Sequence, residues 1–529
     1  MPRSFSRLEL IFITVCFFVL FDNFTFFRKV VEVYPLSWEN SGFLISTALV
    51  LGALMMVVFT LLSNRYVLKP MLIVLIFISA FTNYFMQTYN VIIDKTMIQN
   101  MVETNVDESL DLLNLKMALY GFFLGVIPAW LVYKAPMKYG SFKQELLSTL
   151  KGVVIALVVM VALLLSFSKF YTSFFRENKP LRFYTNPTFY LHSAGAYVFE
   201  KFYKHDATIL PLGEDAKQKK VEGEKRKLTI MVVGEAARAN RFSLNGYERQ
   251  TNPFLAKEEI INLSNVSSCG TSTAISVPCM FSHLQRSNYS DRVAKQTENV
   301  IDIIKRSGAS VLWRDNNSDS KGVAIRVAYE DYRSPKNNTI CDEECRDEGM
   351  LVGLQEYINA QKGDILIVLH QMGNHGPAYY KRYPKAYERF MPVCQTNQVE
   401  QCTTEEIGNA YDNAILYTDY FLSKTIGFLK ANDEAFQTAL IYMADHGESL
   451  GEKGLYLHGI PYFMAPSDQT HVGALMWFGE HTKKRINVEE LRSKANESYS
   501  HDNLFYTLLG VMGVETAVYD AKKDILNYR

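Results

Sequence analysis

The sequence has no excess of charge of either sign. Its 529 residues include 55 Lys plus Arg and 55 Asp plus Glu, which removes any overall electrostatic case for a nucleic acid partner. It also contains no CxxC sequence, and this absence argues against a zinc–thiolate centre. The length favours two domains. Apolar residues crowd into the first third and charged residues dominate from about Lys201, so a membrane part precedes a soluble part.

Five stretches approach the roughly 20 apolar residues that cross a bilayer. They are residues 8–26, 43–62, 70–89, 117–133 and 150–170. The first follows Arg3 and Arg7 and has no small-residue cleavage site after its apolar core. It is therefore predicted to be a retained anchor, with a cleaved signal peptide as the alternative.

Charged flanks predict the orientation of these spans. Basic residues lie between spans two and three and between spans four and five: Arg65, Lys69, Lys134, Lys138 and Lys143. The intervening loop, residues 94–111, is acidic. The positive-inside rule then places the N-terminus in the cytoplasm. An odd number of spans delivers everything after residue 170 to the outside.

The cysteines agree with this topology. Cys16 lies in an apolar run, where a small buried side chain is expected. The other six follow the last span and fall as neighbours: Cys269 with Cys279, Cys341 with Cys345, and Cys394 with Cys402. An even set outside the membrane predicts disulfides in an oxidising compartment. Pairing by neighbours is a preference among the many connectivities that six cysteines permit.

Two transitional segments separate the membrane part from the soluble part. Residues 176–205 are rich in aromatic side chains, which suits either a membrane-interface helix or packing against the soluble domain. Residues 214–227 form a polar tether with too little apolar content to fold alone. We therefore predict a transmembrane domain at 1–172, an interfacial segment and linker at 173–227, and a soluble catalytic domain at 228–529.

Within the soluble part, short β-rich apolar runs alternate with amphipathic helical stretches. The runs are residues 228–233, 310–313, 365–369, 439–443 and 473–478. Such alternation predicts an α/β sandwich around a largely parallel sheet. Functional residues should then gather at the ends of the strands.

Potential metal ligands follow several of these predicted strands. Glu235, His375, and the pair Asp445 and His446 all come just after an apolar run, and His458 lies on a glycine-bounded loop soon afterwards. Carboxyl ends of parallel strands share one edge, so these side chains can meet in one crevice. Carboxylate and imidazole are the ligands of catalytic zinc. Taken singly, a carboxylate after a strand is often only a helix cap.

A second candidate is the segment CGTSTAISVPCMFS, residues 269–282. Small hydroxyl residues there lead into a helical stretch, whose N-terminus favours an anion, although Ser and Thr before a helix commonly serve as caps. A disulfide between the flanking Cys269 and Cys279 would hold the loop rigid for in-line attack. A threonine hydroxyl is a weak nucleophile, and coordination to zinc would lower its pKa. Spacing does not choose among Thr271, Ser272 and Thr273.

Four motifs together resemble those of the lipid A phosphoethanolamine transferases, which include the mobile colistin-resistance enzymes. They are GEAARANRFSLNGY, CGTSTAISVPCMFS, HQMGNHGPAY and ADHGESLGE. The resemblance spans the whole chain. It implies an α/β fold of the alkaline phosphatase and sulfatase type behind five transmembrane helices. It also implies that Thr273, rather than Thr271 or Ser272, is the nucleophile.

The resemblance implies roles for further residues. It assigns the primary zinc ligands to Glu235, Thr273, Asp445 and His446, and a second-metal or phosphate-binding role to His375 and His458. One zinc ion or two is implied. Residues matching those that contact phosphoethanolamine in relatives are Asn100, Thr104, Glu108, Ser318 and Lys321. Glu108 would hold the ammonium group and Lys321 the phosphate. The Cys341 to Cys345 spacing is tighter than relatives lead us to expect.

The implied activity is transfer of phosphoethanolamine from phosphatidylethanolamine to lipid A through a covalent threonine intermediate. This reaction would weaken the binding of cationic peptides and confer polymyxin resistance. The implied location is the bacterial inner membrane, multi-pass, with a periplasmic catalytic domain, and we predict a monomer. Alternatives keep the fold and donor but change the acceptor to core heptose, a periplasmic glucan or water. A membrane-anchored sensor without catalysis is the alternative from another class.

Overall fold

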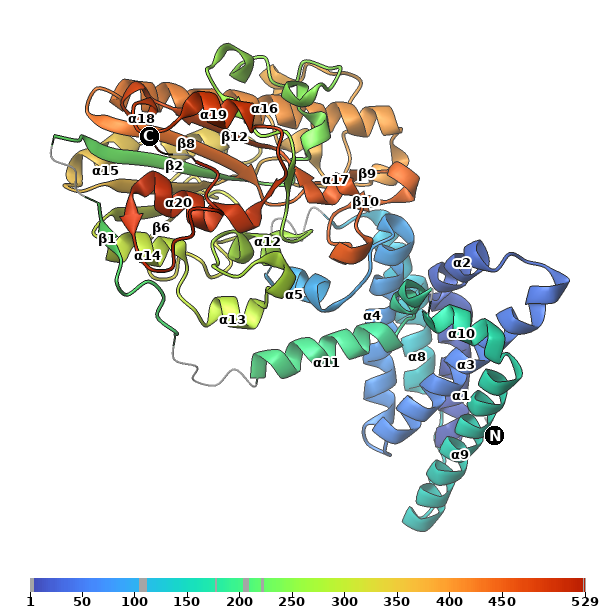
Figure 1. Ribbon diagram of the computed structural model, residues 1–529. Helices are drawn as coiled ribbons and strands as arrows, with labels where there is room; N and C mark the ends of the chain where they lie inside the picture. The colour runs from blue at the N-terminus through green and yellow to red at the C-terminus, as the bar shows by residue number, and fades with distance from the viewer. Residues whose placement is uncertain are drawn as a thin grey trace. The chain divides into compact units, whose positions relative to one another are not determined.

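The computed structural model describes residues 4–103, 112–176, 178–202, 209–219, 223–526 and 528. The chain forms two compact units (Figure 1). The first unit comprises Met1–Ile98 and Leu113–Lys201, and the second comprises Gln99–Leu112 and Phe202–Arg529. Residues 99–103 therefore group with the second unit although they follow a helix of the first in sequence.

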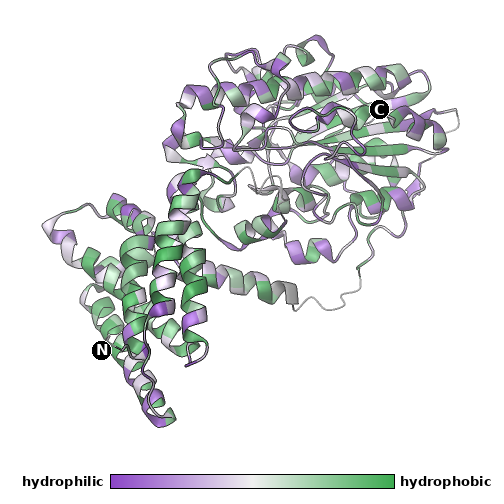
Figure 2. Cartoon of the chain, turned by 180° about the vertical axis from the view of Figure 1, so that it is seen from behind, coloured by the Kyte–Doolittle hydropathy of each residue, from purple (hydrophilic) through white to green (hydrophobic). Residues whose placement is uncertain are grey.

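Among the residues that the structure describes, the first unit contains four helical stretches that are long and apolar enough to cross a membrane. They are α3 (Trp38–Leu62), α4 (Leu68–Tyr89), the continuous stretch Leu115–Lys134 and α9 (Phe142–Ser166). The third of these is built from α7 (Leu115–Tyr120), a π-helical turn (Gly121–Val126) and α8 (Ile127–Lys134). Helix α3 packs against α9, and α4 packs against α8. Hydrophobic residues cover these helices along their length (Figure 2).

The first predicted span is a broken helix. Helix α1 (Arg7–Phe17) continues as a π-helical turn to Asp22, and α2 (Phe24–Val33) follows at a bend of 59°. Counted as one span, this pair makes five. Asn23 lies at the break, where its Nδ2 donates to the carbonyls of Phe18 at 2.9 Å and Asn186 at 2.5 Å. Because Asn186 is 163 residues away, local sequence does not predict the bend.

The aromatic segment after the last span folds as helices. Helix α10 (Ser168–Arg176) leads through a 3-10 turn (Lys179–Tyr184) to α11 (Thr188–Phe202). Tyr190 of α11 is buried, and its hydroxyl lies 3.4 Å from Ser79 of α4. Phe199 on the same helix is 61% exposed. Within the first unit, α11 therefore packs against α4 through Tyr190, whereas Phe199 is exposed.

The second unit is built around a seven-stranded sheet with strand order β3-β12-β8-β2-β7-β5-β6. The strands are β2 (Arg226–Gly234), β3 (Ile261–Asn262), β5 (Ser310–Asp315), β6 (Ala328–Asp331), β7 (Ile365–His370), β8 (Phe436–Ala444) and β12 (Ala474–Phe478). The block from β8 to β6 is parallel, whereas β12 runs antiparallel to β8 and β3 antiparallel to β12. The predicted strands are all present, and the largely parallel sheet is confirmed.

Helices cover both faces of this sheet. Helix α16 (Thr404–Asn432) lies over one face, and α14 (Val300–Arg306) and α20 (Leu504–Met512) lie over the other (Figure 1). Strands β7 and β8 are buried at every residue, as continuous apolar runs between two helical layers require. The result is an α/β/α sandwich.

Part of the predicted tether is ordered by pairing with the end of the chain. Strand β1 (Lys217–Gln218) pairs antiparallel with β14 (Val514–Glu515). Strand β2 then begins at Arg226, two residues before the predicted start at Leu228. A polar segment that cannot fold by itself gains backbone partners here from residues almost 300 positions later in the sequence.

Candidate active site

The carboxyl ends of the three central strands are in register. Val233 of β2 pairs with His370 of β7, and Gly234 pairs with Ala444 of β8. The next residues, Glu235 and Asp445, therefore leave the sheet side by side at one edge. The backbone confirms this proximity, since the Asp445 amide donates to the Gly234 carbonyl at 2.9 Å.

Four predicted ligands converge at this edge. His446 Nε2 lies 3.2 Å from Glu235 Oε1 and 3.5 Å from Asp445 Oδ2. The Thr273 hydroxyl donates to Glu235 Oε2 at 3.0 Å and lies 3.4 Å from His446 Nε2. Glu235, Asp445 and His446 are fully buried, and Thr273 is 7% exposed. The structure thus brings together residues that are up to 211 positions apart in sequence.

The pKa shifts of Glu235, Asp445 and His446 show that the cluster favours a positive charge between its carboxylates. Burial, followed by repulsion from Glu235, raises the pKa of Asp445 to about 6. Burial alone would favour neutral His446, yet the Asp445 and Glu235 carboxylates raise its pKa to about 10. Burial also opposes ionisation of Glu235, but attraction to His446 outweighs it and lowers the Glu235 pKa. Two buried carboxylates this close need a proton or a cation between them.

The donor set fits a metal ion. Among the described residues, Glu235 Oε1 and Asp445 Oδ2 are buried without a hydrogen bond. Ligand atoms of Glu235, Asp445 and His446 all lie within 4.8 Å of one another. His446 Nδ1 lies 2.8 Å from the Gly447 carbonyl, and donation through Nδ1 leaves the Nε2 lone pair facing the carboxylates. This orientation is typical of a metal-binding histidine.

Thr273 is presented by the loop that the sequence singled out. It is the first residue of α12 (Thr273–Met280), and Ser272 is the cap residue. The Cys269–Cys279 disulfide joins the preceding loop to this helix. His501 adds a further tie, because its Nδ1 accepts from the Cys269 amide at 3.0 Å while its Nε2 lies 3.0 Å from the Ala444 carbonyl. Burial lowers the pKa of His501 to about 4, consistent with this neutral bridging role.

Thr271, one of the three candidate hydroxyls, links the Thr273 loop to the loop that carries His458. Its hydroxyl donates to the Ile460 carbonyl at 2.7 Å, and its carbonyl accepts from the Gly459 amide at 2.8 Å. Gly459 and Ile460 directly follow His458, so these bonds hold the loop just after the histidine. The three hydroxyl residues therefore differ in environment, since Ser272 Oγ is buried without a hydrogen bond among the described residues.

We expect Thr271→Val to reduce kcat/KM by about tenfold, because loss of its hydrogen bond lets the loop that carries His458 shift, and a small displacement near a reacting centre has a large effect on rate. Loss of the hydroxyl leaves the buried Ile460 carbonyl unpaired, which should also cost about 1–3 kcal/mol of stability. Steady-state kinetics and thermal unfolding of the purified variant measure both effects. Thr271→Ser retains the donor and should recover most of the activity; equal losses in both variants would contradict this role.

Three histidines form a group beside the carboxylates. The His458 ring centroid lies 4.3 Å from that of His446 and 5.6 Å from that of His375. Glu448, which is fully buried, lies 3.0 Å from His458 Nδ1 and accepts from the Tyr379 hydroxyl at 2.9 Å. Burial and the nearby His446 lower the pKa of His458. The ligand atoms of His446, Glu448 and His458 make a second group that could hold a metal ion.

The five predicted substrate-binding residues lie in two separate segments, the loop after β5 and residues 100–108. Ser318 and Lys321 are buried on the loop after β5, and Lys321 Nζ donates to the carbonyls of Ser318 at 2.7 Å and Glu103 at 3.3 Å. Asn100 lies in helix α5 (Lys95–Glu103) rather than in a loop. Thr104 and Glu108 lie outside the described residues.

Sequence reasoning missed three residues that contact this site. Asn317 Nδ2 donates to Glu235 Oε2 at 2.8 Å and to the Gln371 carbonyl at 2.7 Å. Glu448 and His501 were missed as well. Asn317 directly precedes the predicted Ser318, and Glu448 lies two residues after His446 within ADHGESLGE, so proximity to a candidate was a usable signal. His501 follows no predicted strand and had no such signal.

Comparisons with known proteins agree with this architecture. A family model described as "Sulfatase" matches residues 227–514, and one described as "Phosphoethanolamine transferase EptA/EptB" matches residues 51–202. The chain is 43% identical to phosphatidylethanolamine transferase Mcr-1 of Escherichia coli over 97% of this chain and 96% of that one. It is 41% identical to phosphoethanolamine transferase EptA of E. coli K12, over 97% and 94%.

A solved structure extends the similarity to the whole fold. The integral membrane protein lipooligosaccharide phosphoethanolamine transferase A from Neisseria meningitidis superposes with a TM-score of 0.94 at 36% identity, covering 98% of each chain. Fold and site together define a membrane-anchored enzyme with a sulfatase-type catalytic domain. The chain belongs to the EptA/EptB family of phosphoethanolamine transferases. It is a multi-pass inner-membrane enzyme whose catalytic unit faces the periplasm.

Proposed function

We propose that this enzyme transfers phosphoethanolamine from phosphatidylethanolamine to a phosphate of lipid A through a covalent intermediate on Thr273. The observation that carries the proposal is the position of the Thr273 hydroxyl. It stands at the N-terminus of α12 within 3.4 Å of His446 and 3.0 Å of Glu235. A phosphoryl group there would meet free backbone N–H groups and the positive end of the helix dipole.

The transfer takes place in two displacements. Thr273 Oγ1 forms a bond to phosphorus as the bond to the diacylglycerol oxygen breaks, and diacylglycerol leaves with a proton. An oxygen of a lipid A phosphate then forms its bond to phosphorus as the Thr273 bond breaks, and the proton that the phosphate gives up restores the Thr273 hydroxyl. A zinc ion held by Glu235, Thr273, Asp445 and His446 would supply the Lewis acid that makes the hydroxyl nucleophilic. The Cys269–Cys279 disulfide keeps the attacking atom in place.

The remaining predicted residues bind the donor. His375 and His458 lie beside His446 and are assigned to the phosphoryl oxygens, where charge develops in the transition state. Lys321 is assigned to the phosphate and Glu108 to the ammonium group, and Asn100, Thr104 and Ser318 are assigned to further contacts with the phosphoethanolamine group. We propose the division 1–172 for the membrane domain, 173–227 for the interfacial segment and linker, and 228–529 for the catalytic domain, acting as a monomer.

Mass spectrometry of lipid A tests donor and acceptor together. Lipid A from cells that produce the protein should carry added phosphoethanolamine, and those cells should tolerate polymyxin better than cells without it, because the added amine offsets phosphate charge. Unmodified lipid A together with modified core heptose or glucan would show that the acceptor is that glycan rather than lipid A. Release of free phosphoethanolamine from labelled phosphatidylethanolamine, without any modified acceptor, would instead identify a hydrolase.

A further inference from the structure

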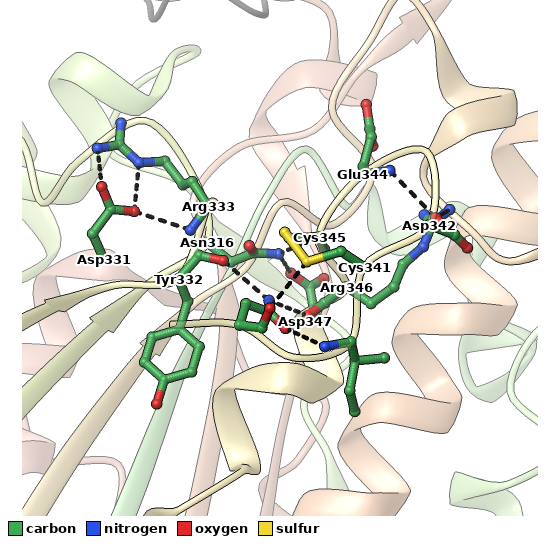
Figure 3. The surroundings of a disulfide bond; sticks show 12 residues. Asn316, Asp331, Tyr332, Arg333, Cys341, Asp342, Glu344, Cys345, Arg346 and Asp347 are labelled. Carbon is green, nitrogen blue, oxygen red and sulfur yellow. Dashed lines mark hydrogen bonds and ion pairs between the residues drawn. A yellow bond between two sulfur atoms is a disulfide. The ribbon is translucent and has the colours of Figure 1, made fainter. Parts of the chain in front are cut away.

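The segment 341–347, which we call the bracket, contacts both ends of the loop 371–382 that carries His375. The bracket begins with a disulfide between Cys341 and Cys345, whose Cα atoms are 3.9 Å apart. It ends at Asp347, and Figure 3 shows the disulfide and Asp347 beside Asn316. None of its residues was a predicted site residue apart from the two cysteines.

Asp347 holds the beginning of the His375 loop. Its buried carboxylate accepts hydrogen bonds from the Met372 amide at 2.9 Å, the Gly373 amide at 3.1 Å and the Gln371 side chain at 3.2 Å. The same carboxylate also accepts a hydrogen bond from Asn316 Nδ2 at 2.8 Å. Asn316 directly precedes Asn317, which donates to Glu235. One carboxylate therefore anchors two loops that both contact Glu235.

The conformation at Gly373 needs such an anchor. Its φ is +52°, and a Cβ there would lie 2.9 Å from the Glu235 carbonyl oxygen. The next amide, that of Asn374, donates to the same carbonyl at 3.1 Å. The chain thus passes directly against the backbone of Glu235 immediately before it reaches His375, and Asp347 fixes the two peptide groups that make this close approach possible.

The other end of the loop is held through Arg382. Its Nε donates to the His375 carbonyl at 2.6 Å, and its Nη1 pairs with Glu344. Glu344 lies inside the disulfide-closed ring, where its carbonyl accepts from the Asp342 amide at 3.0 Å. Arg346 adds a bond from Nη1 to the Lys381 carbonyl at 2.6 Å. Both Arg382 and Arg346 are buried, so these bonds are shielded from competing water.

We propose that Glu344, Arg382 and Asp347 are positioning residues that hold His375 for the transferred phosphoryl group, with the Cys341–Cys345 disulfide keeping Glu344 in place. The proposal rests on the phosphoryl-binding role of His375 in the proposed function. Glu344 is linked to the histidine through the Arg382 guanidinium, which pairs with the Glu344 carboxylate and donates to the His375 carbonyl. Loss of the carboxylate releases the guanidinium and lets the histidine move away from its productive position.

A double-mutant cycle tests this route. Glu344→Gln is matched in size and should lower kcat and kcat/KM together, by about tenfold, in the full-length enzyme with labelled phosphatidylethanolamine and lipid A. In a His375→Ala background the same substitution should change the rate by less than about twofold. Glu258→Gln breaks a more exposed ion pair, with Lys430, outside the bracket, and should leave the wild-type rate unchanged.

Equal losses from Glu344→Gln in both backgrounds would overturn the proposal, as would no loss in the wild-type background. If His375→Ala itself keeps full activity, the proposed role of His375 fails, whereas an unmodified lipid A in wild-type cells would mean that the proposed function fails. A second comparison uses the disulfides: Cys341→Ser with Cys345→Ser should lower kcat several-fold only when His375 is present. The double variant Cys394→Ser with Cys402→Ser removes a disulfide outside the bracket. Its effect on kcat should be the same with and without His375.

Discussion

Replacing Thr273 with alanine is expected to abolish transfer, with kcat reduced by roughly 1,000-fold or more, because the substitution removes the group that forms the covalent intermediate in the mechanism we propose. The fold should survive, since Thr273 begins α12 rather than filling the sheet core. Intact-protein mass spectrometry after incubation with phosphatidylethanolamine and no acceptor should show an added phosphoethanolamine group on the wild type and none on the variant.

Ser272→Ala is the matched control for this experiment. Ser272 is as buried as its neighbour, and its hydroxyl makes no hydrogen bond among the described residues. We expect its activity to stay within about twofold of the wild type, because no interaction is lost. Thr273→Ser keeps a hydroxyl at the same position and should retain measurable transfer. An adduct that persists in Thr273→Ala and disappears in Ser272→Ala would move the nucleophile to the neighbouring residue.

Removal of metal is expected to eliminate activity and to lower the stability of the second unit. A ligand that binds only the folded state stabilises it by about 2.7 kcal/mol at 100 times its Kd, which corresponds here to a fall in Tm of roughly 5 °C on chelation. Without a cation the buried Glu235 and Asp445 carboxylates face each other across His446. Dialysis against a chelator, followed by activity and thermal unfolding measurements before and after adding Zn²⁺ or Mg²⁺, tests both effects. Recovery with zinc alone is the expected result.

Two asparagine substitutions that flank β8 make this test specific. Asp445 directly follows the carboxyl end of β8. Asp445→Asn removes the charge of this proposed ligand, so chelation should no longer change the Tm of the variant. Asp433→Asn lies before the amino end of that strand, where Asp433 accepts from Thr438 Oγ1 at 2.6 Å and from the Glu480 amide at 2.9 Å. This control should respond to chelation as the wild type does. A Tm of the wild-type protein that is indifferent to the chelator would contradict a structural contribution from metal.

Much of the catalytic unit follows from local sequence. Strands β2, β7 and β8 each contain a mainly apolar run, and the residues just beyond β2 and β8, Glu235 and Asp445, are acidic. A buried parallel strand favours both features, because its two faces are covered and the crevice for ligands lies beyond its carboxyl end. The direction of β12 does not follow in this way. A run of five apolar residues has the same pattern in a parallel and in an antiparallel strand. The antiparallel direction of β12 is therefore known from its pairing with β8.

The choice of nucleophile shows how far residue patterns reach. Composition and spacing pointed to a hydroxyl loop between Cys269 and Cys279, and the family resemblance selected Thr273. The structure separates the three hydroxyls by environment: Thr271 bonds to the His458 loop, Ser272 lacks a partner among the described residues, and Thr273 faces Glu235 and His446. No local property of a Ser or Thr encodes such a difference.

Local residue patterns are enough to define the class of the protein: an apolar anchor, a soluble part with paired cysteines, and carboxylate and imidazole groups at strand ends. These features are local, since hydrophobic period, charge and residue type act within a few positions of the chain. The bend at Asn23, the bond from Asn317 to Glu235 and the bracket around His375 become visible in the folded protein alone. Each depends on side chains and carbonyls that approach from distant parts of the chain, and such approaches are set by packing of the whole unit rather than by any one segment.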